Sequence, residues 1–199
     1  SPPGTTGRWP ADGGFGFQRP DGKFVVVNGG GSAVTNIYDP VANTFTAGSS
    51  LASGTAQWGS HAITRPDGTF LIINGNNGTA TNLYNPITNT FTAGQTLAFN
   101  VGMGSHSIQR PDGKFLIVAG GTSANTAVYD PVSNTFSTGP KPPNNVANGG
   151  HAIQRPDGKF LIINGAGSTN TTIYDPIANT VTAGPALSST VSTGGYSIQ

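Results

Sequence analysis

The stretch RPDGKFLIINGAGSTNTTIYDPIANTVTAG, residues 155–184, decides how this chain folds. Close variants of it begin at three earlier arginines, Arg19, Arg65 and Arg110. In every copy a Tyr lies nineteen residues after the Arg and is followed by Asp or Asn and then Pro. The repeat period is about 45 residues, which indicates a solenoid, a propeller or another repeat array. The repeat therefore has to be interpreted before any single motif.

Charged residues are scarce in this 199-residue chain. They make up 9% of it, against about 25% in an average soluble protein, and Glu is absent. A net charge of +1 without a basic cluster gives no reason to expect binding to nucleic acid or to an anionic membrane. No apolar run approaches the roughly 20 residues that span a bilayer. The absence of Cys excludes disulfides, thiolate metal sites and Cys nucleophiles.

Each repeat predicts four short strands. The first lies before the Arg, as in residues 59–64, and Arg-Pro-Asp-Gly then turns the chain, because Pro presets φ and Gly accepts the left-handed conformation. The second strand is apolar at every position, as in residues 70–73. The third ends in an aliphatic residue and Tyr, Asp/Asn-Pro-x-x-Asn-Thr makes the next turn, and a short fourth strand follows, as in residues 44–46.

The second strand determines the architecture. A strand that is apolar on both faces must be covered on both sides, and the hairpin turns demand antiparallel neighbours. Radial repetition of such four-stranded sheets is the β-propeller, whereas the coils of a β-solenoid are usually shorter and parallel. We therefore predict an all-β fold, a β-propeller of four-stranded antiparallel blades built from four near-identical repeats plus a surplus strand.

The repeats resemble kelch repeats, in particular the bacterial and galactose-oxidase-like kind. The resemblance rests on a His in the first strand, the Pro-Asp-Gly turn, an apolar second strand that ends in Gly29-Gly30 or Gly120-Gly121, and Tyr-Asp-Pro with a later aromatic residue. It covers nearly the whole chain and implies a propeller. Kelch proteins include enzymes, adaptors and surface proteins, so the resemblance leaves the function open.

Two features depart from the kelch pattern. Gly75-Asn76 and Gly165-Ala166 replace the paired glycines, and Phe or Val replaces the usual Trp of the fourth strand. The resemblance to galactose oxidase would imply a copper centre with a Cys–Tyr cross-link, which a chain without Cys cannot form. We accordingly predict no cofactor.

The repeats divide residues 1–199 into blades of one module. We expect blades at about 13–58, 59–103, 104–148 and 149–193, followed by an extra first strand at 194–199. Four blades and a surplus strand suggest a window of a longer array that continues in both directions. A four-bladed ring with a spare strand, or a piece of a six- or seven-bladed ring, are the alternatives.

Three histidines, His61, His106 and His151, share one position of the first strand. If this strand lines the propeller axis, three imidazoles converge there, and three His ligands with one open position are typical of catalytic zinc. The competing interpretation is that each His braces neighbouring backbone. No carboxylate that would orient the imidazoles is evident in the sequence.

The loops after the second and fourth strands differ among the repeats, and meander connectivity places them at one end of the blades. Trp58, Phe99 and Met103 in these loops are candidate contacts for a glycan or a partner protein, with neutral variation of exposed loops as the alternative. Asn77 and Asn170 begin Asn-x-Thr sequons and are candidate N-glycosylation sites. At the opposite end, the repeated Arg and Asp are interpreted as turn chemistry with solvated charge.

The leading functional expectation is a non-enzymatic structural module of an extracellular or cell-surface protein. Near-equal blades and the lack of catalytic groups favour a tandem array or fibre, formed by head-to-tail self-association. The composition, rich in Thr, Asn and Gly, is typical of exported proteins. A glycan- or protein-binding propeller is the alternative, and a metal-dependent enzyme at the histidines is the third hypothesis.

Overall fold

The computed structural model describes residues 13–192, so the expected extra strand at 194–199 lies outside the described residues. Within this range the chain forms strands and turns, and none of it is assigned as helix. No helix in this range is therefore long and apolar enough to cross a membrane.

The strands fall into four sheets of four, each made of consecutive strands. Their bounds are β1 Phe15–Gln18, β2 Phe24–Val27, β3 Thr35–Asp39 and β4 Thr44–Ala47; β5 His61–Thr64, β6 Phe70–Ile73, β7 Thr81–Asn85 and β8 Thr90–Ala93; β9 His106–Gln109, β10 Phe115–Val118, β11 Thr126–Asp130 and β12 Thr135–Thr138; β13 His151–Gln154, β14 Phe160–Ile163, β15 Thr171–Asp175 and β16 Thr180–Ala183.

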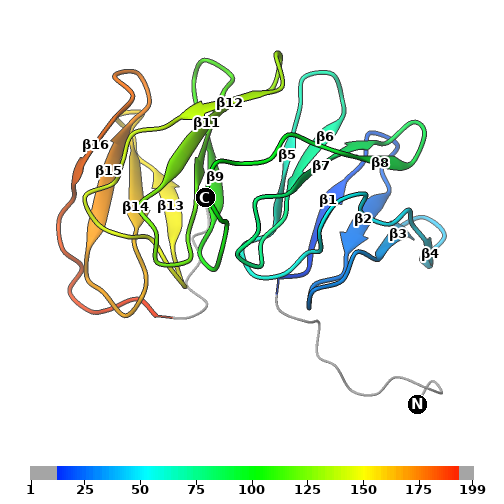
Figure 1. Cartoon of the computed structure of the whole chain (residues 1–199), viewed down its shortest axis with the longest axis horizontal. Coiled ribbons are helices and arrows are strands. Elements are labelled where there is room, and N and C mark those ends of the chain that lie inside the picture. The colour runs from blue at the N-terminus through cyan, green and yellow to red at the C-terminus, as the bar shows by residue number, and fades with distance from the viewer. Residues whose placement is uncertain (1–12, 193–199) are drawn as a thin grey trace.

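Each sheet is an antiparallel meander in which every strand pairs with the next along the chain. The sheets follow one another in chain order, from β1–β4 at the right of Figure 1 to β13–β16 at the left. The pairing register repeats between sheets: Phe70 lies opposite Tyr84 in one sheet as Phe115 lies opposite Tyr129 in the next. This arrangement confirms the predicted all-β, propeller-like fold, and we call the sheets blades 1 to 4.

The turns form as their residues require. In blade 1 the Arg19 amide donates to the Lys23 carbonyl at 2.7 Å, and Gly22 takes a φ of 82° that closes the hairpin. After the third strand, the Asp39 carboxylate accepts hydrogen bonds from the Val41 and Ala42 amides at 3.0 Å. Asn43 then adopts a left-handed φ of 54°, which explains the Asn at this place in every repeat.

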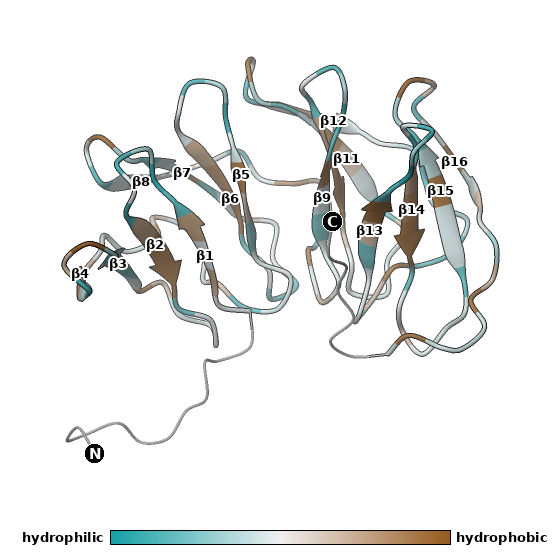
Figure 2. Ribbon diagram, turned by 180° about the vertical axis from the view of Figure 1, so that it is seen from behind, coloured by the Kyte–Doolittle hydropathy of each residue, from teal (hydrophilic) through white to brown (hydrophobic). Residues whose placement is uncertain are grey.

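The core lies between neighbouring blades. Each blade turns one face toward the preceding blade, and we call it the Tyr face; in blade 2 it consists of Phe70, Ile72, Tyr84 and Phe91, all buried. The opposite face, the Leu face, turns toward the following blade; in blade 2 it consists of Ile63, Leu71, Ile73, Leu97 and Val101. Figure 2 shows the apolar second strands β2, β6 and β14 in brown.

The prediction that the second strand is covered on both faces holds for the inner blades. All four residues of β6 are buried, and Leu116, Ile117 and Val118 of β10 are fully buried. In the two end blades one face is only partly covered: Val26 on the Tyr face of blade 1 and Leu161 on the Leu face of blade 4 are half-buried. The described part of the chain supplies no blade beyond these faces.

Arginines of the Arg-Pro-Asp-Gly turns join neighbouring blades. Arg19 donates to the Tyr84 hydroxyl at 3.2 Å and to the Pro86 carbonyl at 2.9 Å, and Arg65 donates to the Pro131 carbonyl at 3.1 Å. Arg110 donates to the Tyr174 hydroxyl at 3.0 Å and to the Asn179 amide oxygen at 2.7 Å.

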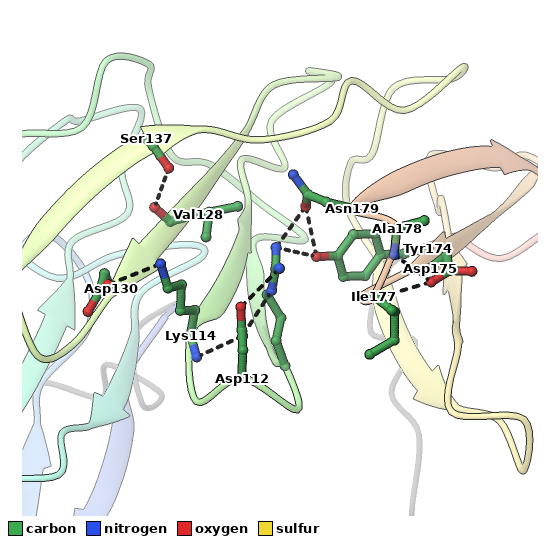
Figure 3. A network of polar contacts seen from close by, with 11 residues as sticks. Asp112, Lys114, Val128, Asp130, Ser137, Tyr174, Asp175, Ile177, Ala178 and Asn179 are labelled. Atoms are coloured by element: carbon green, nitrogen blue, oxygen red, sulfur yellow. Dashed lines mark hydrogen bonds and ion pairs between the residues drawn. The ribbon is translucent and has the colours of Figure 1, made fainter.

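The expectation of solvated arginines is therefore wrong. The first three arginine side chains are only 10–13% exposed, because each lies in the seam between two blades. Figure 3 shows Tyr174 and Asn179 of blade 4 facing the blade 3 turn that carries Asp112. The Asp112 carboxylate lies 3.1 Å from the Arg110 guanidinium and holds it in place, so the turn positions the arginine that bonds across the seam.

Candidate functional site

The first strands of neighbouring blades lie close together on the inner side of the molecule. The His61 Nε2 atom is 2.7 Å from the Ser107 hydroxyl, which joins β5 to β9, and β9 also contacts β13. In His61, His106 and His151 alike, Nδ1 donates to the carbonyl of the Gly two residues earlier, at 2.9 Å. This position of the first strand therefore braces the loop that leads into it.

The geometry of the three imidazoles lends no support to a metal site. Residues 13–192 contain no group of three His, Cys, Asp or Glu side chains placed to hold a metal ion. Burial lowers the pKa of His61, and it lowers the pKa of His106 to about 4, with smaller contributions from the neighbouring His61 and His151. His61 and His106 are thus neutral at pH 7.

A pocket of about 350 Å³ opens at the loop end of blades 2 to 4. Two of the three predicted contact residues, Trp58 and Met103, lie in it together, with exposed fractions of 39% and 37%. Its other side chains are Asn76, Asn77, Thr122, Ala147, Asn148 and Ala166. The volume is within the range of small-molecule sites, about 300–1,000 Å³.

Backbone hydrogen bonds between two kinds of loop build this pocket. The loop after the second strand donates to the loop that enters the next blade three times: from Asn76 to the Trp58 carbonyl, from Gly121 to the Met103 carbonyl and from Ala166 to the Asn148 carbonyl, at 2.7–3.1 Å. Gly75 is required by this contact, since a Cβ there would lie 1.9 Å from the Trp58 carbonyl oxygen. Trp58, Met103 and Asn148 are therefore equivalent residues, presented by a fixed main chain.

Several pocket residues have a backbone conformation that favours Gly. Asn76, Asn77, Thr122 and Ala166 have φ values of 53–65°, whereas blade 1 carries Gly30 and Gly31 at the same two positions. A left-handed Thr is a genuine outlier, and such a residue costs of the order of 1–3 kcal/mol. Four of the eight non-Gly residues with positive φ in residues 13–192 thus line this pocket, and the other four are the Asn of the turn after each third strand.

The chemistry of the lining is uncharged. The side-chain amides of Asn76, Asn77 and Asn148 make no hydrogen bond within residues 13–192, and no Lys, Arg, Asp or His contributes to the pocket. An Asn amide both donates and accepts, and Trp58 offers an apolar ring with one N–H donor. The site can therefore bind a neutral ligand that carries both hydroxyl groups and apolar C–H surface.

Two larger cavities, of about 480 and 520 Å³, lie between first strands at the opposite end of the blades. They are equivalent to each other, since each is lined by the Arg-Pro of one turn and the first strand of the next blade. Because they repeat with the blades, they follow from the packing of any two neighbours. The loop-end pocket, by contrast, is lined by residues that differ from blade to blade.

The remaining predicted residues are placed apart from the Trp58–Met103 pair. Phe99 packs half-buried against the core between blades 2 and 3 and lines a separate groove, apart from Trp58 and Met103. Asn170 is exposed in its loop outside the pocket. Asn77, the other sequon residue, lies within it.

Sequence reasoning missed Asn76, Thr122, Asn148 and Ala166. The sequence alone could have pointed to three of the four, since they stand at positions where blade 1 or the kelch pattern has Gly. The fourth, Asn148, occupies the same repeat position as Trp58 and Met103.

The sequence matches no protein-family model and no curated protein. A similar solved structure is that of a fungal alcohol oxidase of the AA5 family, in complex with copper, with a TM-score of 0.64 and 15% sequence identity. The superposition covers 94% of this chain and 44% of the oxidase chain. The likeness shows the fold.

This comparison contradicts our expectation that the chain is not an enzyme. That expectation used the uniformity of the blades as an argument, yet the same fold carries an oxidase. The residues of this chain do not fit the copper centre that the resemblance implied, because the sequence has no Cys for a Cys–Tyr cross-link. The three histidines do not replace it, since residues 13–192 hold no group of three His, Cys, Asp or Glu side chains placed to bind a metal ion.

Proposed function

We propose that this chain is a kelch-like propeller module that binds a short neutral glycan in its loop-end pocket. The observation that carries the proposal is that Trp58 and Met103 lie in one pocket with three amide side chains that have no hydrogen-bond partner within the described residues 13–192. A sugar ring presents an apolar face that packs on Trp, and hydroxyl groups that both donate and accept, as an Asn amide does. The uncharged lining disfavours phosphorylated or acidic ligands.

The fixed main chain around the pocket supports the same proposal. Strained, hydrogen-bonded loops hold Trp58 and the amides in place before a ligand arrives, so little conformational entropy is lost on binding. The kelch-like repeat pattern and a composition typical of exported proteins support an extracellular or cell-surface location, where glycans are available.

The test is titration of the 199-residue protein with a panel of neutral di- and trisaccharides of glucose, galactose, mannose and N-acetylglucosamine, followed by calorimetry. We expect at least one to bind, and Trp58→Ala to weaken its binding about tenfold or more, equivalent to about 1.4 kcal/mol. Asn77→Asp introduces an unpaired charge into the lining and is expected to weaken binding as well.

Ile87→Ala is the matched control, because Ile87 is 93% exposed in a turn of blade 2 at the other end of the blade. Its affinity for the saccharide should equal that of the parent protein. No binding by any member of the panel, or equal affinity of the parent and Trp58→Ala proteins, would overturn the proposal.

A structural role in a larger assembly is the second candidate function. The partly uncovered Tyr face of blade 1 and Leu face of blade 4 favour it, since both carry the residues that pack between blades elsewhere. In this role the module would continue head to tail through further blades, in a tandem array or a fibre. Electron microscopy of the protein at high concentration tests it, and particles that show no end-to-end contacts would argue against it.

A further inference from the structure

The two ends of the four-blade arc carry matching halves of one interface. On the Leu face of blade 4, the Arg155 side chain is 37% exposed, whereas the equivalent arginines are 10–13% exposed in the seams between blades. On the Tyr face of blade 1, Phe45 is 64% exposed, whereas its equivalent Phe91 is 9% exposed. The Leu face of blade 4 therefore lacks a Tyr face to pack against, and the Tyr face of blade 1 lacks a Leu face.

The polar half of the interface is already formed at both ends. Arg155 is held by Asp157 at 3.0 Å, as Arg110 is held by Asp112 at 3.1 Å. In blade 1 the Tyr38 hydroxyl donates to the Asn43 amide oxygen at 3.0 Å. The same Tyr–Asn pair occurs in blades 2, 3 and 4 at 2.9–3.1 Å, and in blade 4 it accepts two hydrogen bonds from the Arg110 Nη1 atom. Arg155 is thus a hydrogen-bond donor and the Tyr38–Asn43 pair an acceptor. Each is held by its own blade in the same way as the equivalent groups that bond across the seam between blades 3 and 4.

The apolar half matches in the same way. Blade 1 presents Phe24, Val26 and Tyr38 half-buried, and blade 4 presents Ile153, Leu161, Leu187 and Val191 half-buried. In the seams inside the molecule, the residues at the latter four positions are nearly all below 8% exposed, among them Ile108, Leu116, Leu97 and Val146. The end faces therefore have the side chains of an interblade core without a neighbour in residues 13–192.

We propose that the Leu face of blade 4 docks on the Tyr face of blade 1 of a second copy of this chain, and that two copies close into a ring of eight blades. A two-fold axis satisfies both ends of both copies at once, and two-fold dimers are the commonest oligomers. Eight blades are within the range of known propellers, about four to eight. Inside the chain the first strands already gather on one inner side, as a closed ring requires. The inference rests on the assembly role above and is independent of the glycan pocket.

The test measures the mass of the 199-residue protein in solution by sedimentation velocity and light scattering, from low micromolar to submillimolar concentration. We expect a dimer that dissociates on dilution. Arg155→Asp removes the donor from one half of the interface, and Phe45→Asp places a charge in the other half. Since Phe45 is 64% exposed in the single chain, its replacement leaves the fold of the monomer intact.

Each of these two variants should raise the dimer dissociation constant at least about tenfold. Lys141→Asp is the matched control, because it makes the same change of charge as Arg155→Asp at an exposed loop residue away from both end faces. Its dissociation constant should stay at the parent value.

The outcomes separate this inference from the assembly role. Filaments that both variants disrupt would overturn the closed ring and leave the assembly role standing. A protein that remains monomeric throughout, with residues 194–199 or another segment covering blade 4, would overturn both. A dimer that persists in Arg155→Asp and Phe45→Asp would place the interface elsewhere and overturn the proposed docking.

Discussion

At the scale of single residues, the inner histidines show how one position serves the fold. His106 donates from Nδ1 to the Gly104 carbonyl, and its Nε2 atom is buried without a hydrogen-bond partner among the residues that the structure describes. Burial disfavours the charged imidazolium, so the pKa of His106 falls from 6.5 to about 4. The folded chain therefore holds His106 in its neutral form, while Nδ1 braces the loop before the strand.

The lowered pKa of His106 predicts that the fold loses stability in acid. Below pH 6.5 the unfolded chain binds a proton at His106, whereas the folded chain does not until about pH 4. The free energy of unfolding should therefore fall as the pH drops from 6.5 to 4, by up to about 3 kcal/mol. In His106→Phe, which copies Phe15 of blade 1, this slope should shrink to the part that His61 and the aspartates with a lowered pKa contribute. Urea unfolding at pH 7, 5.5 and 4 measures it, and equal slopes in the two proteins would contradict it.

At the scale of elements, the Arg-Pro-Asp-Gly turn does more than reverse the chain. Its Gly closes the hairpin, its Asp holds the Arg, and its Arg crosses to the next blade. Burial raises the pKa of Tyr84, Tyr129 and Tyr174, against the opposing effect of the nearby arginines. The phenols therefore stay neutral at pH 7, and in Tyr84 and Tyr174 they accept hydrogen bonds from these arginines.

Two substitutions in one turn distinguish the contribution of the seam to stability from that of a surface ion pair. Arg110→Ala removes a buried cation and leaves Tyr174 and Asn179 without their donor, so we expect it to lower the free energy of unfolding by about 2–3 kcal/mol. Lys114→Ala removes a pair with Asp130 in which the Lys side chain is 42% exposed, and we expect a loss below about 1 kcal/mol. Chemical denaturation compares the two, and similar losses would assign Arg110 no special role.

The same elements show what sequence could and could not supply. The bounds of β6, Phe70–Ile73, match the predicted strand, because apolar residues between turn residues specify both its ends and its burial. The path of Arg65 to Pro131 could not be predicted, since it depends on how close the next blade lies.

The loop-end pocket was predictable only in part, because it too depends on contacts between neighbouring loops. Trp58, Met103 and Phe99 look alike in sequence, but the first two follow the residue that pairs with the neighbouring loop, Ala56 or Val101, by two positions, while Phe99 precedes it by two. Only these backbone bridges between loops show that the residues after the bridge line the pocket, whereas Phe99, before it, lines a separate groove.

At the scale of the whole molecule, stability resides in three seams between four blades. Each seam has its own cluster of buried side chains, drawn from two consecutive blades. Such a chain is quasi-one-dimensional, so its stability is a sum of blade and seam contributions. The end blades, with one seam each, are the places where unfolding of the single chain should begin.

Equivalent leucines test this distribution. Leu116 is fully buried between blades 3 and 4, and Leu161, at the same place in blade 4, is half-buried on its uncovered face. At concentrations where the protein is monomeric, Leu116→Ala should cost about 3–4 kcal/mol and Leu161→Ala about half as much. Thermal and urea unfolding give both values. In a dimer that covers blade 4 the difference should diminish, whereas equal costs in the monomer would show that another segment already covers Leu161.

The first repeat is one residue longer than the later ones, since Arg19 and Arg65 are 46 positions apart and the following arginines are 45 apart. In blade 1, Leu51 donates to the Ala33 carbonyl and Ala56 to the Ser32 carbonyl, and residues 52–55 lie between them. In blade 2, Leu97 and Val101 make the equivalent bonds with only residues 98–100 between them. The added length is thus absorbed between two anchored points while both anchors hold. Foreign peptides inserted at the exposed residues 188–190 should accordingly be displayed at the rim without disturbing the blades, which makes the scaffold suited to carrying grafted recognition sequences.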